Sequence, residues 1–73
     1  MTYREAAENL DVLVLAIQDA PGKTIAQGNF HHLGGYVTAL EDAGIITEVQ
    51  GTNWCGYGEA AFKLAKWRAE VKA

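Results

Sequence analysis

Two histidines and one cysteine are the residues of this sequence that could hold a metal ion: His31, His32 and Cys55. Imidazole nitrogen and thiolate sulfur are ligands that zinc prefers in proteins. The two histidines are neighbours in the chain, and neighbouring helical side chains point about 100° apart. They are therefore poorly placed to converge on one ion. We expect one histidine at the surface and the other partly packed, with no metal and no cofactor bound.

Cys55 could also act as a nucleophile, since a thiolate attacks electrophilic centres. It stands in a glycine-rich segment beside Trp54, and nothing in the sequence marks a base for it. Serine is absent, and neither Gly34-Gly35 nor Gly56-Tyr57-Gly58 has the spacing of a phosphate-binding loop. No pair of acids can be assembled for catalysis. We therefore expect a protein that is not an enzyme.

Large aromatic side chains suggest a protein interface instead. Trp54 and Tyr57 stand in the glycine-rich segment 51–58, and tryptophan and tyrosine are common hot-spot residues of interfaces. Trp54 could alternatively fold back onto the end of a helix. The residues predicted to bind a protein partner are Trp54, Tyr57, His31, His32 and Tyr36.

The basic residues gather near the C-terminus of the sequence. Of six lysines and arginines, four fall in the last eleven positions, around Trp67: Lys63, Lys66, Arg68 and Lys72. They could contact nucleic acid or an acidic protein surface. The alternative is a solvated helix face, with cations near the helix C-terminus as its dipole favours. The formal net charge of −3 gives the chain no general attraction to phosphate.

The first element is predicted to be a helix. Thr2 and Glu5 have the spacing of a capping box, and apolar residues then recur at steps of three and four. Val12 and Leu15 widen the apolar surface, so we expect the second half of this helix to be covered nearly all round. Pro21 disfavours helical geometry at the preceding residue and ends the helix near Asp19. Pro21-Gly22 fits the centre of a type II turn.

The middle of the chain is predicted to hold a brief extended piece at 23–27 and a second helix after it. Asn29 is the expected N-cap of this helix, and Gly44 supplies the left-handed residue that closes it. Leu33, Val37 and Leu40 fall on one face. Gly34-Gly35 indicates either a close approach to another backbone or a break of the helix into two pieces.

The last third is predicted to form a β-hairpin and a short helix. Ile45 to Gln50 is rich in β-branched residues and is interpreted as a strand. Three glycines make the segment 51–58 a hairpin connection. The segment 59–64 could be the return strand or the start of a helix running to Val71. We favour the strand, because the strand at 45–50 would otherwise have two open edges.

This order of elements resembles the winged-helix superfamily. Leu40-Glu41-Asp42-Ala43-Gly44-Ile45-Ile46 is similar to the end of its recognition helix, particularly in bacterial repressors of the antibiotic-resistance and metal-sensing types. Phe62-Lys63-Leu64-Ala65-Lys66-Trp67-Arg68-Ala69 resembles the end of its wing and the start of the next helix. The resemblance implies an α+β fold of helix, short strand, helix, β-hairpin and helix, in one domain over residues 1–73. It also implies sequence-specific DNA binding, as by a repressor or an excision factor.

Two features depart from the winged-helix pattern. Only six residues separate Gly22 from Asn29, where the family usually fits a whole helix. No lysine or arginine stands between Lys23 and Lys63, so the supposed recognition helix and wing lack the side chains that commonly bind phosphate and guanine. The resemblance suggests DNA, whereas the charges favour a protein partner.

We therefore expect a small regulator that docks on a protein, with DNA binding as the alternative. By analogy of size and charge it resembles bacteriophage host-takeover factors, which inhibit host machines such as RNA polymerase or CRISPR complexes. Cys55 cannot form an internal disulfide, and no apolar run approaches the roughly 20 residues of a membrane span. The N-terminus lacks the pattern of a secretion signal. We expect a cytoplasmic protein.

Overall fold

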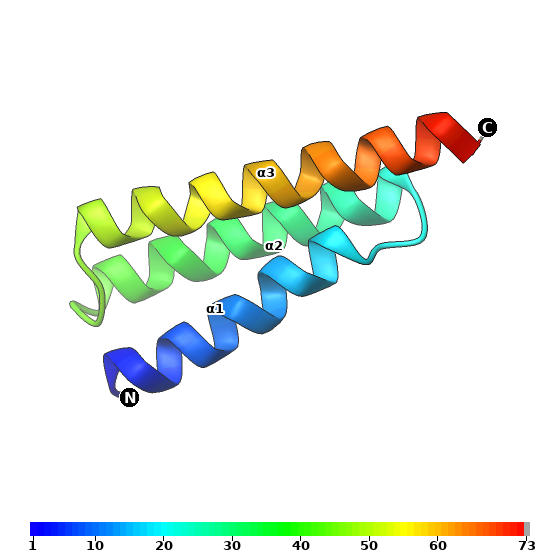
Figure 1. The fold of residues 1–73 in the computed structure, drawn as a ribbon. Helices are drawn as coiled ribbons and strands as arrows, with labels where there is room; N and C mark the ends of the chain where they lie inside the picture. Colours follow the sequence, from blue (N-terminus) through cyan, green and yellow to red (C-terminus); the bar gives the residue numbers. More distant parts are fainter. Residues whose placement is uncertain (73) are drawn as a thin grey trace.

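Three α-helices joined by two short loops make up the chain in a computed structural model that describes residues 1–72, the side chain of Lys72 excepted (Figure 1). α1 spans Tyr3–Gln18, α2 spans Lys23–Asp42 and α3 spans Glu48–Lys72. The helices run up, down and up, and each packs against the other two. The result is an elongated bundle whose Cα atoms extend over 42 × 17 × 14 Å.

The predicted α+β fold and the winged-helix resemblance are both wrong. Residues 1–72 contain no strand, whereas a winged helix requires a β-hairpin. The expected short strand at 23–27 is the first turn of α2. The expected strand at 45–50 is a loop followed by the start of α3, and the expected hairpin at 51–58 and return strand at 59–64 are both part of α3. The helical alternative for 59–64 is the correct one.

The prediction for α1 is confirmed at both ends. Thr2 accepts a hydrogen bond from the backbone N–H of Glu5 at 3.2 Å, and the Glu5 carboxylate accepts one from the backbone N–H of Thr2 at 3.1 Å. The helix ends at Gln18, with Asp19 as its C-cap. The second half is not covered all round, because Val12 and Leu15 are exposed. A bundle of three helices leaves one flank of each helix in water.

α2 begins seven residues earlier than predicted. Gly22 is its N-cap with φ −163°, which also rules out the predicted type II turn, since that turn needs a positive φ at this position. Asn29 lies inside the helix and donates a hydrogen bond to the backbone oxygen of Ala16, 3.0 Å away. Neither interpretation of Gly34-Gly35 holds: α2 continues through both, and a Cβ at either position would meet nothing within 4 Å.

The junction between α2 and α3 uses two capping motifs. Gly44 has φ 71°, as predicted, and the N–H of Ile45 donates to the oxygen of Leu40 at 2.9 Å, which is a Schellman ending. Thr47 then accepts from the N–H of Gln50 at 3.1 Å, and the Gln50 side chain accepts from the N–H of Thr47 at 2.8 Å. This second capping box starts a new helix where a strand was predicted.

Small residues let α3 lie close to its neighbours. Gly51, Gly58, Ala61 and Ala65 are buried and recur at steps of seven, three and four, so they face the bundle interior. A Cβ at Gly58 would stand against Leu33 and 3.3 Å from two carbons of the Phe30 ring. Two of the three glycines that indicated a hairpin connection, Gly51 and Gly58, are therefore packing residues of a helix.

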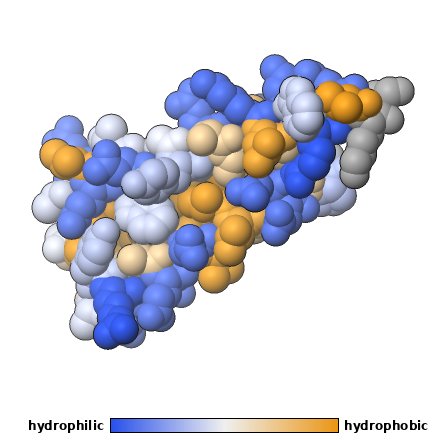
Figure 2. All heavy atoms as spheres, viewed as in Figure 1, coloured by the Kyte–Doolittle hydropathy of each residue, from blue (hydrophilic) through white to orange (hydrophobic). Residues whose placement is uncertain are grey.

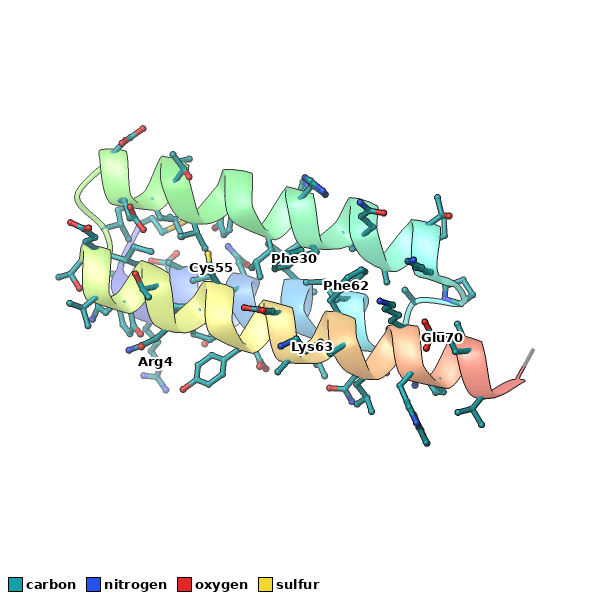
Figure 3. The ribbon with its side chains drawn as sticks, turned by 90° about the horizontal axis from the view of Figure 1, so that it is seen from above. Arg4, Phe30, Cys55, Phe62, Lys63 and Glu70 are labelled. Carbon is teal, nitrogen blue, oxygen red and sulfur yellow. The ribbon has the colours of Figure 1, made fainter. Side chains whose placement is uncertain are left out.

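The core runs along the axis of the bundle. Figure 3 shows Phe30 of α2 and Phe62 of α3 between those two helices, and their rings stack at 5.8 Å between centroids. The buried apolar residues of the central cluster are Ala6, Leu10, Ile17, Leu33, Val37, Leu40, Ile46 and Ala61. The predicted face of Leu33, Val37 and Leu40 is confirmed.

Candidate docking surface

Trp54 and Tyr57, the two aromatic residues predicted at a hairpin tip, lie one turn apart on α3 instead. Trp54 is half-buried and packs against the core, so it does fold back, while Tyr57 keeps 59% of its surface exposed. Their rings meet edge to face, 5.6 Å apart at 81°. Trp54 thus lies on the core side of the pair, and Tyr57 contributes most of the exposed surface of the pair.

These two side chains line an open groove of about 490 Å³ between α1 and α3. Val14 and Leu15 contribute from α1, and Leu64 contributes from α3 beside the aromatic pair. Asp11 is the charged residue in the lining. Hydrophobic residues gather along the middle of this face in Figure 2, where α1 and α3 meet. The lining of this groove is mostly apolar, and it includes both of the predicted aromatic residues.

An apolar line continues from this groove along the outside of α3. We call this line the outer seam: it comprises Tyr57, Ala60, Leu64, Trp67 and Val71. The steps between its members alternate between three and four, which places them on one side of a helix. Leu64, Trp67 and Val71 are 44%, 59% and 62% exposed. The seam therefore presents large apolar side chains to solvent over the second half of α3.

The other three residues predicted to bind a partner lie elsewhere. His32 and Tyr36 line a shallow hollow between α1 and α2, and the Tyr36 hydroxyl accepts a hydrogen bond from the Asn9 amide at 3.0 Å. His31 is exposed on α2, and its ring meets Phe30 edge to face. The structure thus divides the predicted set between two sides of the bundle.

The basic residues grouped by sequence do not gather on one face. Arg68 is half-buried and donates a hydrogen bond to the backbone oxygen of Gln18, so it faces α1. Lys63 points outward and pairs with Glu59 at 3.4 Å. Lys66 lies 2 positions before Arg68, so it points to another side of α3. Lys72 was predicted with them, but its side chain lies outside the described part of the chain.

Arg4 and Lys23 do not complete a basic face either. Arg4 lies about 21 Å along α1 from Gln18, at about 1.5 Å per residue, and therefore far from Arg68. Lys23 begins α2 at the opposite end of the bundle from Arg4. Arg4 is therefore separated from Lys23 and Arg68 by the length of the bundle, and Arg68 turns toward α1. These cations of the described surface do not form one continuous track for a phosphate backbone.

The surroundings of Cys55 disfavour its thiolate form. Burial raises the pKa of its thiol, and the nearby charge of Glu41 raises it further. A higher pKa leaves less thiolate at neutral pH, and the thiolate is the reactive and metal-binding species. Among residues 1–72, no three side chains of His, Cys, Asp or Glu are grouped so that they could hold a metal ion.

Sequence reasoning missed Leu15 and Leu64 as members of the exposed apolar face. The signal was present in the alternating three and four steps of the outer seam. Steps of three and four place residues on one face only in a helix. The prediction of a hairpin for 51–64 therefore gave no reason to group these residues.

The described helices and the wider comparisons give no further identification. No helix in residues 1–72 combines the length and apolar character that crossing a membrane requires. A comparison with protein-family models, with curated proteins and with solved structures finds no match to this chain.

Proposed function

We propose that this protein is a non-catalytic helical domain that docks on a protein through the apolar face formed by the α1–α3 groove and the outer seam of α3. The observation that carries the proposal is the outer seam itself. Large apolar side chains recur on it at helical spacing, and Leu64, Trp67 and Val71 are 44%, 59% and 62% exposed. Contiguous exposed apolar surface of this kind is typical of interaction sites.

The residue types on this face favour a protein partner. Trp67 and Tyr57 are each 59% exposed, and these two residue types supply much of the binding energy at interfaces. Charged side chains are absent from the outer seam, so a partner can cover it without burying an unpaired charge. An apolar partner surface packed on this seam would remove it from water, which contributes roughly 25 cal/mol per Å² toward binding, against the entropy lost on association.

The spacing of the seam also indicates the kind of partner. Steps of three and four are the repeat with which one helix packs against another. A partner that presents an amphipathic helix can therefore place its own apolar stripe along Tyr57, Leu64 and Val71. The narrower prediction of a host machine such as RNA polymerase or a CRISPR complex stays a prediction. Location in the cytoplasm belongs to this proposal as well, supported by the single cysteine.

Photo-crosslinking tests the proposal. The amino acid p-benzoylphenylalanine replaces Trp67 on the proposed face, or Ile25 as a control, since Ile25 is 52% exposed but lies on α2. Illumination in a lysate of the producing cells is expected to give a discrete protein adduct from position 67 and not from position 25. The adduct should disappear when Leu64→Asp is added to the same chain. Docking through this face would be contradicted if position 67 gave no adduct, or if the adduct formed equally well in the chain that carries Leu64→Asp.

The control for folding is circular dichroism of each variant. Leu64 is 44% exposed, so aspartate at this position can keep its carboxylate in water. We expect the helical signal of Leu64→Asp to match that of the unaltered chain. A loss of helical signal would require the less disruptive Val71→Ser variant, at a seam position 62% exposed, in its place.

A further inference from the structure

The outer seam of α3 has the pattern of one helix of a two-helix coiled coil. Tyr57, Leu64 and Val71 are seven residues apart, and Ala60 and Trp67 fall between them. In the notation of coiled coils the first three occupy a positions and the other two occupy d positions. α1 and α2 cover a different seam of the same helix, where Gly51, Gly58 and Ala65 are buried. α3 thus carries two seams, and only the inner one has its partner within the described part of the chain.

The charges beside the outer seam differ between its two flanks. Lys63 and Glu70 follow one flank, at the g positions, and are seven residues apart. Figure 3 shows both on α3. Ala61 and Arg68 follow the other flank, at the e positions. Charged residues at e and g positions set the orientation and register of paired helices.

We infer that the partner of the outer seam is a second copy of this chain, with the two α3 helices antiparallel and Lys63 of each copy opposite Glu70 of the other. This inference rests on the proposed docking role of the seam. In this register Leu64 of one copy packs against Trp67 of the second copy, and Ala60 packs against Val71 of the second copy. A two-fold axis then passes between Leu64 and Trp67.

Charge complementarity favours this arrangement over the two registers shifted by one heptad and over a parallel pair. In an antiparallel pair, g positions face g positions, so the register above forms the Lys63–Glu70 pair twice. A shift by one heptad in one direction places Lys63 against Lys63 of the second copy, and a shift in the other direction places Glu70 against Glu70. A parallel pair brings g positions against e positions and sets Lys63 against Arg68. Each of these alternatives opposes like charges.

The groove lies on the same side as the inferred partner. Arg68 donates to Gln18, so the C-terminal turn of α1 stands level with the two-fold axis. Leu15 is 47% exposed one turn before Gln18 and is therefore close to that axis. Association would bring α1 of each copy toward the second copy as well, giving a four-helix arrangement of two α1 and two α3 helices. Leu15 then adds apolar surface to the contact between copies.

Charge-swap variants test the inference by sedimentation equilibrium over a range of protein concentrations. The unaltered chain is expected to dimerise. Lys63→Glu places two carboxylates opposite each other at both pairs, and Glu70→Lys places two ammonium groups opposite each other at both pairs. Each single change is expected to weaken the dimer about tenfold or more, because two attractive pairs become repulsive. The double swap Lys63→Glu/Glu70→Lys restores both attractive pairs and should restore the dimer.

A mixture of the two single variants gives the sharpest result. The Lys63→Glu chain carries two acids at its g positions and the Glu70→Lys chain carries two cations, so together they should form a heterodimer. Uniform ¹⁵N labelling of one of the two chains separates the masses of the heterodimer and the homodimers in native mass spectrometry. Lys63→Gln is the matched control: it also breaks the pair with Glu59 seen at 3.4 Å, but introduces no repulsion, so its effect should be smaller than that of Lys63→Glu.

The outcomes separate this inference from the proposed function. The antiparallel pairing of α3 is overturned if the chain stays monomeric at millimolar concentration. It is also overturned if the charge swaps leave the dissociation constant of the dimer unchanged. If position 67 still crosslinks to a different protein in that case, docking through the seam stands without self-association. If the adduct from position 67 has twice the mass of one chain and the charge swaps act as described, both are supported.

Discussion

Gly58 fixes how closely α3 approaches α2 at the middle of the bundle. A Cβ at this position would overlap Leu33, which is fully buried, and would stand 3.3 Å from the Phe30 ring. Leu33 cannot move aside, because it has core residues around it. Gly51 is different, since the atoms nearest to its added Cβ belong to the Glu41 carboxylate, the end of a flexible side chain. Gly56 has nothing within 4 Å.

Alanine substitutions at Gly58 and Gly56 should therefore change the unfolding free energy in opposite directions. Gly58→Ala gains about 1 kcal/mol of helix propensity but overpacks the core at a penalty of about 1–3 kcal/mol, so we expect a net loss of unfolding free energy. Gly56→Ala should raise the unfolding free energy by about 0.5–1 kcal/mol. Urea titration followed by circular dichroism measures both. Stabilisation by Gly58→Ala would contradict the close approach of the two helices.

At the scale of the element, α2 carries two glycines that no contact in the described structure requires. Gly34 and Gly35 lie in the middle of a continuous helix with open space where a Cβ would be. The Thr38 hydroxyl donates to the backbone oxygen of Gly34 at 3.0 Å, a bond that alanine at position 34 would keep. Neither a break nor a close approach explains the pair.

Replacing these glycines should stabilise α2. Gly34→Ala and Gly35→Ala are each expected to add about 0.5–1 kcal/mol, because alanine restricts the unfolded chain and favours the helix. For a domain of this size about 1 kcal/mol corresponds to a rise in Tm of about 4–8 °C. Thermal unfolding of the single variants and of the double variant checks this. A fall in Tm would show that a neighbour approaches α2 here after all.

At the scale of the whole molecule, the core is small enough for one side chain to decide whether the bundle folds. A core of this size supplies about 3–5 kcal/mol of net stability. Leu33 is fully buried at the contact with α3. Leu33→Ala is expected to remove about 2–5 kcal/mol, through lost burial and the cavity left behind. The variant should therefore lose much of its helical signal at room temperature.

The control for Leu33→Ala is a truncation of an exposed residue on α1. Val12 is 64% exposed, so Val12→Ala should change the unfolding free energy by less than about 0.5 kcal/mol. Far-UV circular dichroism and the midpoint of urea unfolding report both variants. Similar stability for the two would mean that Leu33 does not hold the bundle together.

Three features of the chain could be predicted because their signals are local. The Thr2–Glu5 capping box, the apolar stripe of α1 and the left-handed Gly44 each depend on residues within a few positions, and the structure contains all three. The start of α3 has the same kind of signal in Thr47 and Gln50, three residues apart, but the β-branched run beside it favours a strand. Local capping chemistry was the better guide there.

The candidate site could be predicted only in part. Trp54 and Tyr57 were identified by residue type, and both line the α1–α3 groove. Whether His31, His32 or Tyr36 bind a partner stays a prediction, and they lie on a different side of the bundle. The outer seam was not predicted, because its members become neighbours only when 51–71 is one helix.

The sequence by itself determined where α1 lies, which face of α2 is buried and where α2 ends, since helix periodicity and capping act over short distances. Only the tertiary structure decided that the glycines of 51–58 belong to a helix. Glycine is a poor helix former on its own. The places of Gly51 and Gly58 depend on Glu41, Leu33 and Phe30, far away in sequence, which fill the space that a side chain would take. The same packing decided which apolar residues were left in water, because a three-helix bundle can cover only one side of each helix.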